Sequence, residues 1–261
     1  MKLEHTQTKS EVRQAIVRQI EEEIEQNPRN NYMVSLPAEN WFTENMVLPI
    51  FWKQKKHKHT LHCYECDPKV FVRNLKNLPF TMDPINHWLQ DPSCNHPTYI
   101  TGKSENVEVI YQFGNLNVET LNKANEENAI QYRLIGWYDY CGYPIDYPEK
   151  YQTPIEDLMY AFNSYEDALI YVTHLFKFRN TRNDPKIKFN FNIGGKSGIV
   201  HNVKRFLSYC NGKYKNRNSI ERCQIFQDLY VGSTNSPMLT AGWRTGSTEA
   251  NHITLHQESY I

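Results

Sequence analysis

The chain lacks several of the patterns that assign a protein to a class at once. Its 261 residues include only 11 glycines, and its formal net charge is zero. Zero net charge argues against a protein that coats nucleic acid by bulk electrostatics, although a local basic groove is still compatible with it. No apolar run reaches the roughly 18 residues of a membrane-spanning helix, so we expect no membrane partner.

Signals for export are also missing. Residues 1–7 lack the apolar core of a signal peptide, and we therefore expect an intracellular protein, in the cytoplasm or in a host cell. The six cysteines are then expected to be thiols. The chain does have 39% hydrophobic residues, enough for a sizeable core in one large α/β domain or two small ones. Heavy use of Asn, Lys, Tyr and Ile is typical of AT-rich genomes, such as those of many viruses and mobile elements.

Helical and extended patterns alternate along the chain. Apolar residues at i, i+4 spacing predict an amphipathic helix over 9–26, which Asn27-Pro28 ends. Further helices are predicted over 39–54, where Pro49 should kink or split the element, and over 69–77, 117–128, 154–163 and 198–210. Strands are predicted over 32–36, 60–65, 107–113, 130–139, 168–176, 224–230 and 238–243.

Strands that alternate with helices predict an α/β protein with a mostly parallel sheet and helices on both faces. Right-handed crossovers make this a Rossmann-like three-layer sandwich. Here the sheet has seven strands, and the last two form an antiparallel hairpin. We assign residues 1–28 to an N-terminal amphipathic helix, 29–245 to the Rossmann-like domain and 246–261 to a C-terminal tail.

The strongest signal for a site lies in residues 130–144. The strand there ends in Asp139, and Tyr140 follows before the chain breaks at Gly142 and Pro144. Ligands of open α/β sheets bind beyond the carboxyl ends of the strands. A carboxylate followed by aromatic residues at such an end is where chemistry is expected.

Other polar residues follow the neighbouring strands. Glu65 and Asp67 come at the end of the second strand, and Gly114-Asn115 ends the third. With these positions, the layout of residues 30–245 resembles the seven-strand fold of S-adenosylmethionine-dependent methyltransferases. The resemblance implies S-adenosylmethionine as the cofactor. It implies that Glu65, with Asp67 as the alternate, accepts hydrogen bonds from the ribose, and that Gly114-Asn115 frames the adenine. It also implies that Leu36 lies in the turn beside the cofactor, and that the catalytic residues Asp139 and Tyr140 face the substrate or the sulfonium.

Two features of that family are absent. The turn after the first strand, residues 35–39, contains no glycine, and Pro37 removes a backbone donor from it. The Asn/Asp-Pro-Pro-Tyr motif of amino-methylating DNA enzymes does not occur either. These absences favour a second hypothesis, in which a non-enzymatic protein kept the fold and binds nucleic acid or packs into an assembly. A third hypothesis is a metal-dependent nuclease, but the chain has no suitable Asp…Glu-x-Lys set.

Two further clusters were weighed. Basic residues interleaved with Tyr209 and Tyr214 suit single-stranded nucleic acid, whose bases stack while its phosphates pair. They are Lys204, Arg205, Lys213, Lys215 and Arg217. The second cluster, Cys63, Cys66, Cys94 and His96, matches the nitrogen and sulfur ligands of zinc, but we favour a buried strand position for Cys63 and assign no metal ligands.

Overall fold

The computed structural model of the chain describes most of its helices and strands. The described residues are 9–37, 41–75, 84–85, 99–114, 116, 132–139, 165, 167–175, 204, 206–208, 210, 222–231 and 237–246. Tyr140 and Asn115 therefore lie outside the described residues, as do the helices predicted over 117–128 and 154–163.

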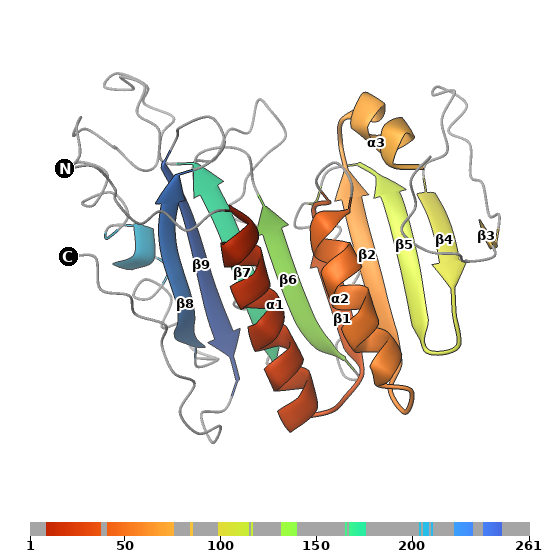
Figure 1. Ribbon diagram of the computed structural model, residues 1–261, viewed down its shortest axis with the longest axis horizontal. Helices are drawn as coiled ribbons and strands as arrows, with labels where there is room; N and C mark the ends of the chain where they lie inside the picture. The colour runs from red at the N-terminus through yellow and green to blue at the C-terminus, as the bar shows by residue number, and fades with distance from the viewer. Residues whose placement is uncertain are drawn as a thin grey trace.

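The strands described form one nine-stranded sheet in the order β3-β4-β5-β2-β1-β6-β7-β9-β8 (Figure 1). Their bounds are Asn31–Ser35 (β1), His59–Glu65 (β2), Pro84–Ile85 (β3), Tyr99–Lys103 (β4), Val107–Phe113 (β5), Arg133–Asp139 (β6), Ala168–Leu175 (β7), Arg222–Val231 (β8) and Pro237–Thr245 (β9). The strands β5, β2, β1, β6 and β7 run parallel to one another. Strand β9 is antiparallel to both β7 and β8, and β4 is antiparallel to β3 and β5.

Helices cover the sheet on the side shown in Figure 1. The helices α1 (Lys9–Gln26) and α2 (Phe42–Lys53) lie on the same face, α1 across β6 and β7 and α2 across β1 and β2, while α3 (Pro68–Leu75) lies at the carboxyl end of β2. The other face is contacted by Phe206, which lies in a helical segment and packs edge-on against His174 at 5.4 Å. The prediction of a Rossmann-like α/β fold is confirmed.

The seven predicted strands are all present, and β3 and β4 are additional. The predicted helix over 9–26 is also confirmed, whereas the helix predicted from residue 39 begins at Phe42. Pro49 does not split the element, because α2 continues through it as one helix. Pro49 lies on the exposed side of α2, where water can take the place of the missing backbone donor.

The apolar core lies between the sheet and the pair α1 and α2. In α1, Ile16, Ile20 and Ile24 are completely buried, as their i, i+4 spacing predicts. Every residue of β1 is buried, which is expected of a central parallel strand covered on both faces. Because the apolar face of α1 belongs to the same core as the sheet, α1 is held in a fixed position over the strand ends.

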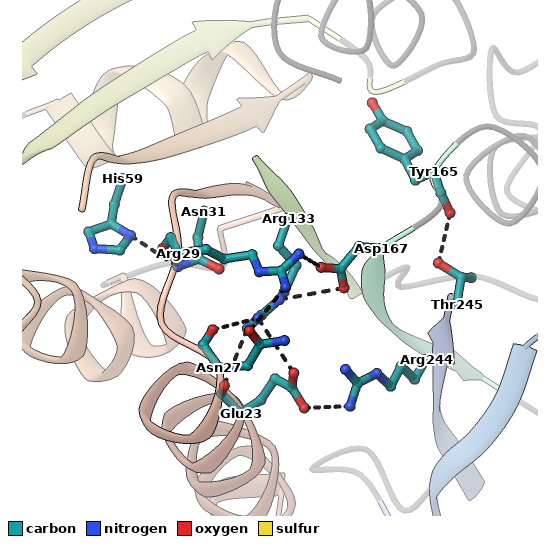
Figure 2. Close-up of polar contacts among 10 residues, drawn as sticks. All are labelled: Glu23, Asn27, Arg29, Asn31, His59, Arg133, Tyr165, Asp167, Arg244 and Thr245. Atoms are coloured by element: carbon teal, nitrogen blue, oxygen red, sulfur yellow. Dashed lines mark hydrogen bonds and ion pairs between the residues drawn. The ribbon is translucent and has the colours of Figure 1, made fainter. Parts of the chain in front are cut away.

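The C-terminal end of α1 is tied to the sheet by a buried ion network (Figure 2). Arg133, at the start of β6, is completely buried and lies 3.5 Å from the Glu23 carboxylate and 3.6 Å from that of Asp167. Glu23 also pairs with Arg244 of β9 at 2.8 Å. This network lies at the amino ends of the parallel strands, so it fixes α1 from the end opposite to the candidate site.

A buried histidine gives the fold a predicted dependence on pH. His59, at the start of β2, is 2% exposed, stacks on Phe51 with ring centroids 4.6 Å apart, and accepts a hydrogen bond from Asn31 Nδ2 at its Nδ1. Burial lowers the pKa of His59 from 6.5 to about 4. The unfolded chain therefore binds a proton at a higher pH than the folded protein does, and stability is lost as the pH falls from 6.5 toward 4.

We expect this loss to be about 3 kcal/mol. The measurement is the free energy of unfolding by urea at a series of pH values, for the natural protein and for His59→Gln. Glutamine keeps an acceptor for Asn31 but does not titrate, so the variant should show the shallower decline. Parallel curves would contradict a role for His59.

Candidate active site at the carboxyl edge of the sheet

The strand order defines where a ligand is expected to bind. From β1 the sheet continues through β2 in one direction and through β6 in the other. Such a reversal of strand order is a topological switch point, and ligands of open α/β sheets bind there, beyond the carboxyl ends of the strands. Ser35 of β1 pairs in register with Cys63 of β2 and Trp137 of β6, so residues just beyond these three surround the switch point.

The end of β2 carries Glu65. It is half-buried, and its Oε1 accepts a hydrogen bond from the Asp67 backbone N–H at 2.8 Å. Burial raises the pKa of the Glu65 carboxyl, whereas hydrogen bonds from the Asp67 and Cys66 backbone lower it and the charge of Asp67 raises it. A carboxylate has about four acceptor positions, so one backbone donor orients the group and leaves capacity for a ligand.

Gly114 lies beside Glu65 at the end of β5. Its backbone N–H donates to the Glu65 carbonyl oxygen at 2.9 Å. The φ of Gly114 is +151°, a conformation that favours glycine, and a Cβ built at this position would have nothing within 4 Å. Among the described residues there is thus open space beside Gly114, at the position where the resemblance expects the adenine.

Asp67 has a structural role of its own. Its Oδ1 accepts hydrogen bonds from the backbone N–H groups of Lys69 and Val70, at 2.7 and 3.2 Å, and so caps the start of α3. Pro68 follows in the first helical position, where its missing N–H costs nothing. Because Asp67 is engaged as a cap, Glu65 is the better placed of the two carboxylates to accept from a ligand.

The turn between β1 and α2 is built without glycine. Leu36 is half-buried and Pro37 is buried, and Trp41 has a φ of +54° in the left-handed region. The Trp41 side chain is completely buried, contacts Tyr111 with ring centroids 4.7 Å apart, and donates from Nε1 to the Asn74 carbonyl oxygen at 3.3 Å. An aromatic side chain thus packs among α2, α3 and β5.

A buried carboxyl group follows in the first turn of α2. Glu44 is completely buried, and its Oε1 accepts a hydrogen bond from the Ser35 hydroxyl at the end of β1. Burial raises the pKa of Glu44, the Ser35 hydrogen bond and Arg13 lower it, and Asp139 raises it. Glu44 follows Phe42, whose ring centroid lies 5.7 Å from the Arg13 guanidinium, and its partner Ser35 pairs in register with Trp137, two residues before Asp139.

Asp139 ends β6 and is bound by the N-terminal helix. Its Oδ2 lies 2.8 Å from Lys9 Nζ and 3.5 Å from Arg13 Nη2, both in the first turns of α1. The Asp139 side chain is 10% exposed and that of Arg13 is 14% exposed. The Arg13 guanidinium also lies 5.7 Å from the ring centroid of Phe42. The candidate catalytic carboxylate is therefore part of a cluster of charges rather than an isolated group.

Tyr111 of β5 is buried between the rings of Trp41 and Phe71, with centroids 4.7 and 4.6 Å away. Burial raises the pKa of its hydroxyl, while a hydrogen bond with Asn74 lowers it.

The sequence did not single out Arg13, Lys9 or Glu44. Arg13 is not one of the apolar residues that predict the helix over 9–26, and its separation of 126 residues from Asp139 leaves no local signal. For Glu44 a signal existed, because it is an acidic residue in the first turn of the helix that follows the first strand.

The zinc hypothesis is only partly covered by the described residues. Cys63 is completely buried in the apolar core, and burial raises the pKa of its thiol well above the usual range. Cys66 is exposed, and Cys94 and His96 lie outside the described residues. Within the described part of the chain, no group of three or more His, Cys, Asp or Glu side chains is arranged to hold a metal.

Of the predicted nucleic-acid-binding residues, only Lys204 has a described side chain, and it is exposed. Arg205, Lys213, Lys215 and Arg217 lie outside the described residues. None of the helices described has both the length and the apolar character needed to cross a membrane.

Comparison with known proteins gives matches of low similarity. No protein-family model and no curated protein matches the chain. Similar solved structures include the cofactor-bound protein Rv0187 from MTB, with 10% identity and a TM-score of 0.42 over 92% of this chain and 82% of that one. Another is a protein described as a class I S-adenosylmethionine-dependent methyltransferase from Listeria monocytogenes (7% identity, TM-score 0.43, 98% of this chain and 66% of that one).

The S-adenosylmethionine-dependent methyltransferase from Agrobacterium tumefaciens is a third (6% identity, TM-score 0.38, 89% of this chain and 62% of that one). At these identities and TM-scores the matches assign neither a family nor an activity to this chain.

Proposed function

We propose that the protein is a divergent S-adenosylmethionine-dependent methyltransferase that binds the cofactor along the carboxyl edge of its sheet. The observation that carries the proposal is the pair of Glu65 and Gly114 at neighbouring strand ends, joined by a backbone hydrogen bond of 2.9 Å, with open space beside Gly114. The strand layout supports it as well, since five parallel strands are followed by an antiparallel pair at the edge.

The residues present fit the nucleoside part of the cofactor. Glu65 has acceptor capacity for the two ribose hydroxyls, and its half-buried setting strengthens such bonds relative to water. Gly114 lets a flat base approach the backbone, because no Cβ stands in the way. These two residues would hold adenosine, and they act by orienting it.

S-adenosylmethionine supplies a methyl group on a positively charged sulfonium. Asp139 and Tyr140 are proposed to face this group or the substrate. A carboxylate and an aromatic face both favour a nearby positive charge. Because methyl transfer depends mainly on alignment, what these residues contribute is placement of the reactants and exclusion of water rather than acid–base strength.

The test is calorimetric titration of the full chain with S-adenosylmethionine. Glu65→Ala should weaken binding roughly tenfold to a hundredfold, because it removes hydrogen bonds to a charged acceptor. Glu105→Ala is the matched control, since Glu105 is exposed in the turn before β5 and should leave binding unchanged. Absence of binding by the natural protein would reject the proposal and leave the non-enzymatic alternative.

Nucleic acid as the substrate rests on the basic residues of the sequence. We propose it as the substrate class to be tested first, with Lys213, Lys215 and Arg217 replaced together by glutamine. Weaker binding to single-stranded oligonucleotides, and a smaller dependence of that binding on salt, would support it. Unchanged binding would exclude that patch.

A further inference from the structure

The outer side of α2 is mostly apolar although it faces solvent. Four exposed residues three or four positions apart form one stripe along the helix, here called the α2 stripe: Phe42, Asn45, Pro49 and Trp52. Phe42 and Trp52 are the exposed large apolar side chains of the described part of the chain, at 54% and 37%. The charged residues of α2 are Glu44, which is completely buried, and Lys53 in its last turn. A helix that is apolar on nearly all sides is normally covered, so the α2 stripe is expected to bind a partner.

Positive charge continues the α2 stripe at its C-terminal end. The loop of residues 54–58, here called the lysine loop, exposes Lys55, Lys56 and Lys58. The backbone N–H of Lys58 donates to Asn30 Oδ1 at 2.9 Å, which fixes the loop to the rest of the fold. Lys53 is paired with Glu21 of α1 at 3.0 Å and adds less to the charge. The lysine loop therefore favours an anionic partner.

The other end of the α2 stripe reaches the candidate active site. The Phe42 ring centroid lies 5.7 Å from the Arg13 guanidinium, and Arg13 Nη2 lies 3.5 Å from Asp139 Oδ2. Ten residues of helix separate Phe42 from Trp52, which is about 15 Å along the axis. The α2 stripe thus runs from the lysine loop, at the amino end of β2, to the carboxyl edge of the sheet (Figure 1).

This combination of groups selects among anionic partners. A single-stranded nucleic acid has flat bases that stack on aromatic rings and phosphates that pair with lysines. A duplex keeps its base faces covered and would leave the two rings exposed. A flat anionic membrane would also meet Glu22 and Glu25, which α1 exposes beside α2, whereas a strand is narrow enough to pass them.

We propose that the α2 stripe and the lysine loop bind single-stranded nucleic acid and lead it toward Asp139. The direction toward Asp139 rests on the proposed function, in which that carboxylate faces the substrate. Bases stack on Trp52 and Phe42, while the lysine loop pairs with phosphates. The substrate thereby reaches the carboxyl edge along the outer side of α2.

The test is binding of the full chain to an oligothymidylate of about 12 nucleotides, followed by fluorescence anisotropy without S-adenosylmethionine. Trp52→Ala should weaken binding roughly tenfold to a hundredfold, whereas Trp52→Phe keeps a ring for stacking and should change it by less than about threefold. Lys55→Gln combined with Lys56→Gln should weaken binding and reduce its dependence on salt. Arg18→Gln combined with Lys69→Gln is the matched control, because it removes two exposed positive charges elsewhere.

Several results would overturn the proposal. One is equal binding by Trp52→Ala and the natural protein, and another is no binding by either. Binding to phosphatidylserine vesicles instead of the oligonucleotide would assign the surface to a membrane. A dimer that Trp52→Ala dissociates, with unchanged oligonucleotide binding, would assign it to a second copy. Unchanged binding by Phe42→Leu would overturn the direction toward Asp139.

Titration with S-adenosylmethionine separates this proposal from the proposed function. Trp52 and Glu65 lie at opposite ends of the sheet, so Trp52→Ala should bind the cofactor as the natural protein does. If the oligonucleotide results fail while the cofactor binds, the proposed function stands. If the natural protein does not bind the cofactor, the proposed function fails, and the oligonucleotide results still decide the nucleic-acid surface. Thermal denaturation confirms that each variant is folded.

Discussion

Replacing Arg133 with methionine is expected to lower the free energy of unfolding by about 3–5 kcal/mol, the usual cost of removing one partner from a buried ion pair. Arg133 is completely buried, and burial lowers its pKa while Asp167 and Glu23 raise it, so the guanidinium stays charged. It donates to the carbonyl oxygens of Asn27 at 2.7 Å and Glu23 at 3.4 Å (Figure 2). Methionine fills similar space but leaves these oxygens and two carboxylates without a central cation.

The measurement is urea denaturation, in which the midpoint should fall while the slope stays constant. Arg18→Met on the exposed side of α1 should change stability by less than about 0.5 kcal/mol. The remaining cations of the network, Arg29 and Arg244, pair with Asp167 and Glu23 from the other side. If Arg133→Met lowers the free energy of unfolding by less than about 1 kcal/mol, then Arg29 and Arg244 are enough to balance the two carboxylates. That result would contradict a central role for Arg133.

Substitution of Gly242 with alanine is expected to cost about 3 kcal/mol, because it over-packs a site that cannot yield. Gly242 of β9 lies opposite Tyr171 of β7. A Cβ at Gly242 would lie 2.6 Å from Tyr171 Cδ1 and 3.0 Å from Phe226 Cβ. The Tyr171 ring has no room to move, since it is completely buried and its hydroxyl donates to Gln19 Oε1 of α1 at 3.2 Å.

A double-mutant cycle tests this explanation. Valine at position 171 lacks the ring atoms that would clash, so Gly242→Ala should cost much less in the Tyr171→Val background. Additive losses would show that the Tyr171 ring is not the cause. Gly114→Ala separates steric clash from backbone strain, because a Cβ at Gly114 would meet nothing within 4 Å. Its cost in stability, about 1 kcal/mol, would come from backbone strain at positive φ.

The fold class followed from local patterns. Apolar runs such as Asn31–Ser35 are fully buried central strands, and the i, i+4 spacing in 9–26 predicted the buried face of α1. The additional strand β4 was not predicted, because residues 99–103, Tyr-Ile-Thr-Gly-Lys, mix apolar and polar residues and include a glycine. The split predicted at Pro49 does not occur, since a proline on the exposed side of a helix costs less than one facing the core.

By itself, the sequence determined that Glu65, Gly114 and Asp139 follow the ends of parallel strands, because periodicity and chain order suffice to place residues at one edge of a sheet. Only the tertiary structure decided what surrounds them. Lys9 and Arg13 reach Asp139 because α1 packs across β6 and β7, and Glu44 is buried against Ser35 because α2 covers β1. Local periodicity reports which side of an element is buried, but the partner on that side depends on strand order and on contacts between residues far apart in the chain.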